Sequence, residues 1–403
     1  MPTGPEPLHR HTARNRDIEC LRAVAVIGVA FHHLQDNLFH PGLPWITQLF
    51  RHLQFWFGVD LFFAISGFVI ARSLLPQMAA HGGHLRAQAG VIGAFWIRRF
   101  WRLLPSAWLW LGLMLLASVI CNRSGVFGSV HANLMATFAG MFDFANFRLA
   151  DAFFRYPYGT SFVYWSLSLE EQFYLLLPLL VAVWRRRIDL LMIALVVIQL
   201  CLWRTPALMF VRTDALALGV LLAIVAPGRT CAALSPRFLH RLGALRVLLP
   251  CLLLACLAWL ASGDLQFWRF RISAIAALAA ILVWLASYDN DYLLPEGHCK
   301  RALVWIGARS YAIYLIHIPV YFLLRELGFR LGIPATVPAW LLAALAIGLV
   351  ALLADLNYRH LEQPLRERGR RLAVSFERRW KERRLPVDTP ALLPSPDPAG
   401  EGP

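Results

Sequence analysis

The chain consists of long apolar runs that alternate with short clusters of basic residues. A helix needs about 20 mostly apolar residues to cross the roughly 30 Å hydrocarbon core of a membrane, and these runs approach that length. Only 16% of the 403 residues are charged, whereas a soluble domain has about a quarter. The sequence therefore predicts an all-α, polytopic bundle of transmembrane helices with the lipid bilayer as a partner, and it excludes an ordinary soluble fold.

Ten apolar runs can be delimited, each of which suits one membrane span. Their approximate limits are 18–38, 53–75, 102–121, 161–184, 188–204, 209–226, 244–262, 269–288, 308–327 and 336–357. The stretch 129–148 is also apolar, but Asn133, Asp143 and Asn146 interrupt it, so we expect a loop or an interfacial segment there. The expected bundle therefore has about ten spans.

Basic residues concentrate in alternate connections between the expected spans. One cluster, Arg185, Arg186 and Arg187, follows the fourth run, while the connections on either side contain fewer cations. Because cytoplasmic loops carry the excess of lysine and arginine, both termini are expected in the cytoplasm. The same rule accounts for the net charge of +15, so we expect no nucleic-acid partner.

These patterns divide the chain into four segments. Residues 1–16 form a basic cytoplasmic N-terminal segment, 17–358 the transmembrane domain, 359–385 a basic amphipathic cytoplasmic tail and 386–403 a disordered tail. In the third segment Phe376 and Trp380 are four residues apart. This spacing suits a basic helix that lies on the anionic inner leaflet of the membrane.

The seven cysteines contain no CxxC pair, and most of them lie in or beside apolar runs. They predict neither a disulfide framework nor a zinc site. No other cluster has metal-ligand spacing, so we expect no metal.

Ionisable residues inside spans are costly and therefore candidates for function. In the first span Arg22 and His33 are eleven residues apart, which returns a helix to nearly the same face and separates the two by roughly 16 Å along its axis. Arg22 is expected near the cytoplasmic end and His33 in the outer half. Alternatively, Arg22 extends to the membrane surface and His33 only bonds a neighbouring helix.

Carboxylates enter two further spans. Asp60, in the second run, is expected at a depth similar to that of His33. It either orients the imidazole and stabilises its positive charge or serves helix packing, and the residues leave both interpretations open. Glu170 and Glu171 open the fourth run, where two adjacent carboxylates are difficult to explain as helix packing.

Two arginines precede the third run on one helical face. Arg99 and Arg102 are three residues apart, so they can bind phosphates together or simply anchor the span. Toward the outer half, with His33 and Asp60, we expect Glu170, Arg212, Asp214 and His317. The polar groups thus sort by depth into an anion site facing the cytoplasm and an outer polar chamber, an arrangement that fits a transporter almost as well as an enzyme.

Seven segments, taken together and in order, resemble the acyltransferase 3 family of membrane O-acyltransferases. The resemblance extends from Asp17 to Pro364. The segments are DIECLRAVAVIGVAFHH, GVDLFFAISGFVI, RRFWRLLPSAW, WSLSLEEQFYLLLP, RTDALALG, SYAIYLIHIPV and LEQP.

The resemblance implies a ten-helix core in a bacterial inner membrane. Such a core takes an acyl group, commonly acetyl, from cytoplasmic coenzyme A, so acetyl-CoA or another acyl-CoA is the expected co-substrate. The acceptor is typically a hydroxyl of a cell-surface or lipid-linked glycan, and sometimes a macrolide-like glycoside. Some relatives carry a fused soluble esterase-like domain, and this chain resembles the form without one.

The family pattern also implies roles for individual residues. The spacing from Arg22 selects His33 as the catalytic histidine, although the family usually has an aromatic or apolar residue where this chain has His32, so the choice between the two stays open. The remaining motif residues are Asp60 and Glu170 as catalytic groups, Arg22, Arg99 and Arg102 for the donor, Arg212, Asp214 and His317 for the acceptor, and Glu362 with Pro364 in the late motif.

We therefore expect His33 to act as a general base on the acceptor hydroxyl or as a transient acyl carrier, with Asp60 or Glu170 steadying the imidazolium. The main rival is a transporter or flippase that uses the same polar interior for protons and substrate. A purely structural membrane partner is disfavoured, because it would not retain so many buried charges.

Overall fold

The computed structural model describes residues 15–39, 42–81, 85–226, 228, 233–333 and 337–382. Almost all of the predicted N-terminal segment, the tail predicted to be disordered, and Cys231 lie outside these residues. Within the described ranges the chain is built from helices and contains no strand, which confirms the prediction of an all-α fold.

Each of the ten predicted runs coincides with a helix. The helices are α1 (Arg16–Asn37), α3 (Gly58–Ala79), α4 (Leu85–Ile120), α7 (Tyr164–Trp184), α8 (Ile188–Cys201), α10 (Asp214–Val225), α13 (Leu248–Leu260), α14 (Arg271–Ser287), α16 (Ser310–Arg330) and α17 (Ala339–Asn357). Six segments in the described residues are long and apolar enough to cross a membrane: Gly58–Ala79, Ala87–Ile120, Ala207–Val225, Gly243–Leu260, Ser310–Arg330 and Ala339–Glu382. Ten spans and cytoplasmic termini stay predictions.

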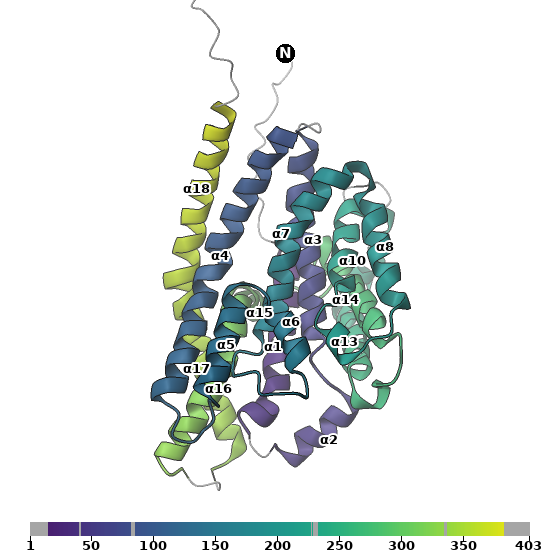
Figure 1. Cartoon of the computed structure of the whole chain (residues 1–403). Coiled ribbons are helices and arrows are strands. Elements are labelled where there is room, and N and C mark those ends of the chain that lie inside the picture. Colours follow the sequence, from purple (N-terminus) through teal and green to yellow (C-terminus); the bar gives the residue numbers. More distant parts are fainter. Residues whose placement is uncertain are drawn as a thin grey trace, which may run out of the picture.

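Shorter helices connect or cover these. They are α2 (Pro44–His52), α5 (Val130–Met141), α6 (Ala145–Ala152), α9 (Pro206–Met209), α12 (Phe238–Arg241), α15 (His298–Ala308) and the tail helix α18 (Gln363–Glu382), with single turns η1 (Arg185–Arg187), η2 (Gly243–Val247), η3 (Gly263–Leu265) and η4 (Tyr358–Glu362). Helix α18 extends beyond one end of the bundle and α2 lies at the other (Figure 1). We call these the α18 end and the α2 end.

Helix α1 lies in the centre of the bundle, in contact with α3, α14, α15 and α16. Glycines permit two of these contacts. A Cβ on Gly307 of α15 would lie 1.9 Å from the Glu19 carbonyl oxygen, and one on Gly58 of α3 would lie 2.5 Å from that of Ala25. Because both neighbours approach its backbone closely, half of the residues of α1 are buried, including the charged side chains of Asp17 and Glu19.

Helices α3 and α10 cross through a reciprocal pair of glycines. A Cβ on Gly67 would lie 2.1 Å from the Leu216 carbonyl oxygen, and a Cβ on Gly219 would lie 2.3 Å from that of Ala64. Small residues at such crossings let backbones approach closely, as they do in membrane helix pairs. This crossing fixes the beginning of α10 against the beginning of α3.

The interrupted stretch 129–148 forms most of a helical hairpin, α5 and α6, instead of an irregular loop. Its turn is at Asp143, whose φ is 56°. The Gln172 side chain donates from Nε2 to the Asp143 carbonyl oxygen (2.6 Å) and to Asn146 Oδ1 (2.9 Å). The polar residues that weaken this stretch as a span therefore hold its turn against α7.

The tail helix α18 lies along α4 (Figure 1). The Phe376 ring occupies the space over Gly93, where a Cβ would lie 2.6 Å from Cε1, and the Trp380 ring occupies the space over Gly90, where a Cβ would lie 2.5 Å from Cδ1. The glycines of α4 leave room for the two rings, which are half-buried against that helix. That the basic tail helix lies on the inner leaflet stays a prediction.

Candidate active site

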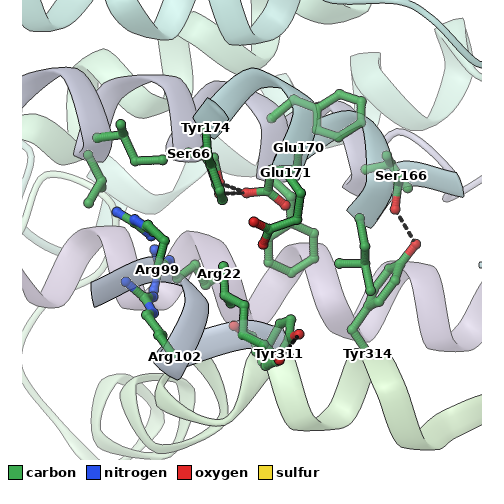
Figure 2. A pocket seen from close by; sticks show the side chains of 18 residues that line it. Arg22, Ser66, Arg99, Arg102, Ser166, Glu170, Glu171, Tyr174, Tyr311 and Tyr314 are labelled. Atoms are coloured by element: carbon green, nitrogen blue, oxygen red, sulfur yellow. Dashed lines mark hydrogen bonds between the residues drawn. The ribbon is translucent and has the colours of Figure 1, made fainter. Parts of the chain in front are cut away.

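Two cavities follow one another through the interior of the bundle. The first lies toward the α18 end, and we call it the arginine cavity because Arg22, Arg99 and Arg102 line it (Figure 2). The second lies toward the α2 end, and we call it the histidine cavity because His32 and His33 line it. The sequence-based sorting of polar groups by depth corresponds to this division except for Glu170, which was expected with His33 in the outer half but lines the arginine cavity.

A wall of side chains separates the cavities. Val59 and Tyr314 line both of them. The Tyr314 hydroxyl donates to the Val163 carbonyl oxygen (3.0 Å) and lies 2.6 Å from Ser166 Oγ, a bond drawn in Figure 2. These bonds fix the Tyr314 ring to the first turn of α7.

In the arginine cavity, carboxylates face the cations. Glu170 Oε1 accepts hydrogen bonds from the hydroxyls of Ser66 and Tyr174 (Figure 2), and Glu171 lines the same cavity. The Arg99 guanidinium lies 4.9 Å from the centroid of the Tyr174 ring. Glu170 does not line the histidine cavity, so the structure does not bring it together with His33.

A groove between α4 and α18 adjoins the arginine cavity. Arg99 and Arg102 line both spaces, and the groove adds Arg366 and Arg370 from α18. These two arginines were not among the predicted site residues, because a basic tail helix suits the membrane surface. Their spacing of four residues, which places both on one face of a helix, was the available signal. We call this space the α4–α18 groove.

His33 belongs to a chain of hydrogen bonds in which each proton can be assigned. His317 Nδ1 lies 2.8 Å from the Tyr314 carbonyl oxygen, and His317 Nε2 lies 2.9 Å from His33 Nδ1. A carbonyl only accepts, so His317 Nδ1 carries a proton and its Nε2 accepts one. His33 therefore donates from Nδ1, and its Nε2 keeps a lone pair.

The adjacent His32 has different surroundings. Its ring stacks on Phe50, with centroids 5.1 Å apart, and its Nδ1 is buried without a hydrogen-bond partner among the described residues. The chain of bonds from His317 reaches only His33. Across the described ranges, no group of three or more His, Cys, Asp or Glu side chains could hold a metal ion.

Asp60 does not contact the imidazole. Arg212 Nε and Nη2 bind its two oxygens at 2.7 and 2.9 Å, and both side chains are buried. The crossing of α3 and α10 brings this arginine to the carboxylate, so the role suggested for Asp60, orienting His33, is filled by His317. Arg212 itself lines the histidine cavity.

The other two residues expected at the acceptor lie behind the lining of the cavity. Asp214 accepts from Arg204 Nη2 (2.7 Å) and Ser273 Oγ (3.2 Å), and it is Arg204 that lines the cavity. His317 lies behind His33 and is likewise absent from the lining. Both residues therefore act on the cavity through a neighbour.

Aromatic rings make up most of the remaining surface of the histidine cavity. They were not among the predicted site residues, since aromatic residues are common at membrane interfaces. They are Trp56, Trp165, Trp203, Trp268, Phe153, Phe154, Phe162, Phe210 and Phe267.

A family model and several relatives match the chain, and both indicate the same family. The acyltransferase 3 family model, described as an acyltransferase domain, matches residues 15–356. YrhL of Bacillus subtilis (strain 168) is 29% identical over 400 aligned residues, which cover 90% of this chain and 57% of that protein.

Two further relatives have names that state an activity. Peptidoglycan O-acetyltransferase OatA of Listeria monocytogenes serovar 1/2a is 29% identical over 377 residues, covering 87% of this chain and 56% of the relative. O-acetyltransferase OatA of Staphylococcus aureus (strain NCTC 8325 / PS 47) is 25% identical over 370 residues, covering 87% and 57%. The chain thus spans little more than half the length of these relatives. No solved structure matches it.

Proposed function

The chain belongs to the acyltransferase 3 family, and from this membership and the geometry of the two cavities we propose that it is a membrane O-acyltransferase. The observation that carries the proposal is the hydrogen-bonded chain from the Tyr314 carbonyl through His317 to His33. It leaves a basic nitrogen of His33 in a cavity that shares a wall with an arginine-lined cavity.

The donor is acyl-CoA, most simply acetyl-CoA, which enters from the α18 end. Its phosphates bind Arg99 and Arg102 together with Arg366 and Arg370 of the α4–α18 groove. The pantetheine arm extends past Arg22 through the arginine cavity toward the wall. This assignment makes the α18 end cytoplasmic, in a multi-pass protein of the bacterial inner membrane, in agreement with the positive-inside rule.

The acceptor occupies the histidine cavity, and His33 is its general base. As the acceptor hydroxyl oxygen forms a bond to the acyl carbon, its proton passes to His33 Nε2. The carbon–sulfur bond then breaks, and the coenzyme A thiolate takes the proton back from the imidazolium. During the step His33 Nδ1–H stays bonded to His317, which holds the ring in one orientation. Acyl transfer through His33 itself is the alternative, and trapping of an acylated histidine would distinguish it.

The acceptor class rests on the relatives. All three carry O-acetyltransferase in their names, and two of the names specify peptidoglycan, so a cell-surface or lipid-linked glycan is the proposed acceptor. A macrolide-like glycoside is the second choice. Tryptophan rings in the cavity lining suit either one, because aromatic faces bind the apolar faces of sugar rings.

A transporter is the rival from another class, because two cavities in series separated by a wall would also suit alternating access. The deciding experiment is the release of free thiol from acetyl-CoA by purified protein in lipid, comparing wild type with His33→Ala, His32→Ala and Arg99→Ala. We expect release by wild type and His32→Ala, none by His33→Ala, and weaker donor binding by Arg99→Ala. Wild-type protein that binds acetyl-CoA no better than Arg99→Ala and never releases thiol, even with glycan acceptors, would overturn the proposal.

A further inference from the structure

The histidine cavity contains more positive charge than its own surroundings balance. Among the described residues, four arginines line it, Arg204, Arg212, Arg269 and Arg271, and no aspartate or glutamate does. Two of the four form ion pairs with carboxylates that do not line the cavity, Arg212 with Asp60 and Arg204 with Asp214.

The other two arginines contact neutral groups among the described residues. Arg269 Nη2 donates to the Cys201 carbonyl oxygen, and its guanidinium lies 5.4 Å from the centroid of the Phe270 ring. Arg271 Nη1 donates to the Ser262 carbonyl oxygen at 3.0 Å. The nearby carboxylate Asp264 is bound to His52 at 2.7 Å. Two positive charges therefore lack a counter-charge in the described part of this cavity.

These charges lie beside the aromatic surface that would hold a sugar. The guanidinium carbons of Arg212 and Arg271 lie 5.4 and 5.6 Å from the centroid of the same ring, that of Trp56. Arg271, half-buried beside this ring, carries a desolvation cost that a bound anion offsets. Arg269 is exposed, so it can bind an anion without such a cost. A neutral glycan would leave that cost in place.

We propose that the histidine cavity selects an anionic acceptor, a sugar with a carboxylate-bearing group that Arg269 and Arg271 bind while the sugar ring stacks on the tryptophans. This inference rests on the proposed function and deepens it, because it restricts the glycan class. Guanidinium binds carboxylate through two parallel hydrogen bonds, which gives orientation as well as affinity. The acid group thereby directs one particular hydroxyl toward His33.

A diphosphate of a lipid carrier offers the same anionic chemistry, so the test must separate the two sources. The probes are a uronic-acid oligosaccharide, its methyl ester as the matched neutral form, and inorganic pyrophosphate. Each is titrated into purified full-length protein in neutral lipid, and quenching of tryptophan fluorescence reports binding, since four tryptophans line the cavity.

We expect the acidic oligosaccharide to bind wild type roughly tenfold more tightly than its methyl ester, a difference of about 1.4 kcal/mol. Arg271→Gln should reduce this ratio toward one without changing the affinity for the ester, and Arg271→Lys should restore part of it. Arg301→Gln, an exposed arginine of α15 outside the cavity, is the control and should keep the full ratio.

Equal affinity for acid and ester, or binding of neither, overturns the inference. Competition by pyrophosphate alone also overturns it, because the charge recognised would then be that of a carrier. Thiol release from acetyl-CoA is measured on the same preparations without acceptor. Its absence in wild type counts against the proposed function, whereas its presence beside equal affinities counts against the anionic acceptor only.

Discussion

The arginine cavity and the histidine cavity both contain arginines, but they hold their carboxylates in different places. In the first, Glu170 and Glu171 are part of the lining, so cations and anions face the same space. In the second, Asp60 and Asp214 are turned away from the space and hold arginines whose other faces line it. Where the carboxylates also line the cavity, their charge balances that of the arginines, which suits a channel that a ligand moves through. Where the carboxylates lie outside the lining, the arginines present their charge to the cavity, which suits a surface that binds a ligand.

The surroundings of the two cavities differ in the same sense. The arginine cavity continues into the α4–α18 groove, where Arg366 and Arg370 extend the cationic surface. The histidine cavity is walled by aromatic rings and contains the imidazole with a free lone pair. Under the proposed function, this difference corresponds to one cavity that binds and guides the donor and another that binds the acceptor and accepts its proton.

The largest effect is expected from a variant that tests whether the histidine cavity serves proton transfer without affecting donor binding. Replacing His317 by Ala removes the acceptor for His33 Nδ1–H, so the ring loses its orientation, and kcat should fall about 10²-fold. The dissociation constant for acetyl-CoA should not change, since the donor binds in the other cavity. His317→Gln, whose amide oxygen can accept the same bond, should retain more activity. A parallel loss of donor affinity in both variants would contradict the separation of roles.

The second prediction compares carboxylates of the two cavities. Asp60→Asn removes the negative charge beside buried Arg212 and one of the two oxygens that accept its hydrogen bonds. We expect it to lower the free energy of unfolding by about 3–5 kcal/mol. Glu170→Gln keeps a side chain that neutral hydroxyls can still bind, so the expected cost is about 1–3 kcal/mol. Thermal unfolding in detergent measures both. A double replacement, Asp60→Leu with Arg212→Met, should recover stability. An equal cost for the two single variants would remove the distinction between the two kinds of carboxylate.

The third prediction concerns the donor groove. Arg370→Gln should raise the KM for acetyl-CoA roughly tenfold, a loss of about 1.4 kcal/mol, with kcat unchanged. Arg371→Gln changes an exposed neighbour on α18 that does not line the groove and should behave as wild type. Initial rates with acetyl-CoA and with acetyl-dephospho-CoA locate the contact. If both arginine variants change KM equally, the effect is one of general surface charge.

The smallest expected effect concerns the α5–α6 turn, which Gln172 of α7 holds in place. Burial raises the pKa of Asp143 from 3.8 to about 7, so the folded state keeps a proton that the unfolded state loses. Stability should therefore fall as pH rises from about 4 to about 7 and then level off. Asp143→Asn keeps a residue that tolerates the positive φ and should abolish this slope. Melting temperatures across that pH range test it, and equal slopes for the two proteins would contradict the raised pKa.

Local patterns predicted a large part of the site. The eleven-residue spacing of Arg22 and His33, the three-residue spacing of Arg99 and Arg102, and the positions of the apolar helices are all visible over short windows of sequence. Each of these patterns depends only on helical periodicity. The arginines line one cavity and the histidine lines the next, in the order that these patterns predicted.

The partners of the buried charges could not be predicted in the same way. Asp60 binds an arginine 152 positions away, and that contact exists because Gly67 and Gly219 let α3 and α10 cross closely. Likewise, the spacing of Phe376 and Trp380 indicates an apolar face but not what covers it. Gly90 and Gly93 of α4 decide that, and helix periodicity contains no information about such a match.

The wall formed by Val59 and Tyr314 has a consequence for the membrane itself. Two polar cavities joined end to end would form a pore, through which protons and ions would flow down their gradients. In the proposed orientation, a wall bonded to α7 through Ser166 and Val163 would keep the membrane electrically sealed while no substrate is present. In the proposed reaction only the acyl group has to pass this point, and neither the coenzyme nor the glycan crosses. Such an enzyme would let a cell export a chemical modification without exporting the molecule that carries it.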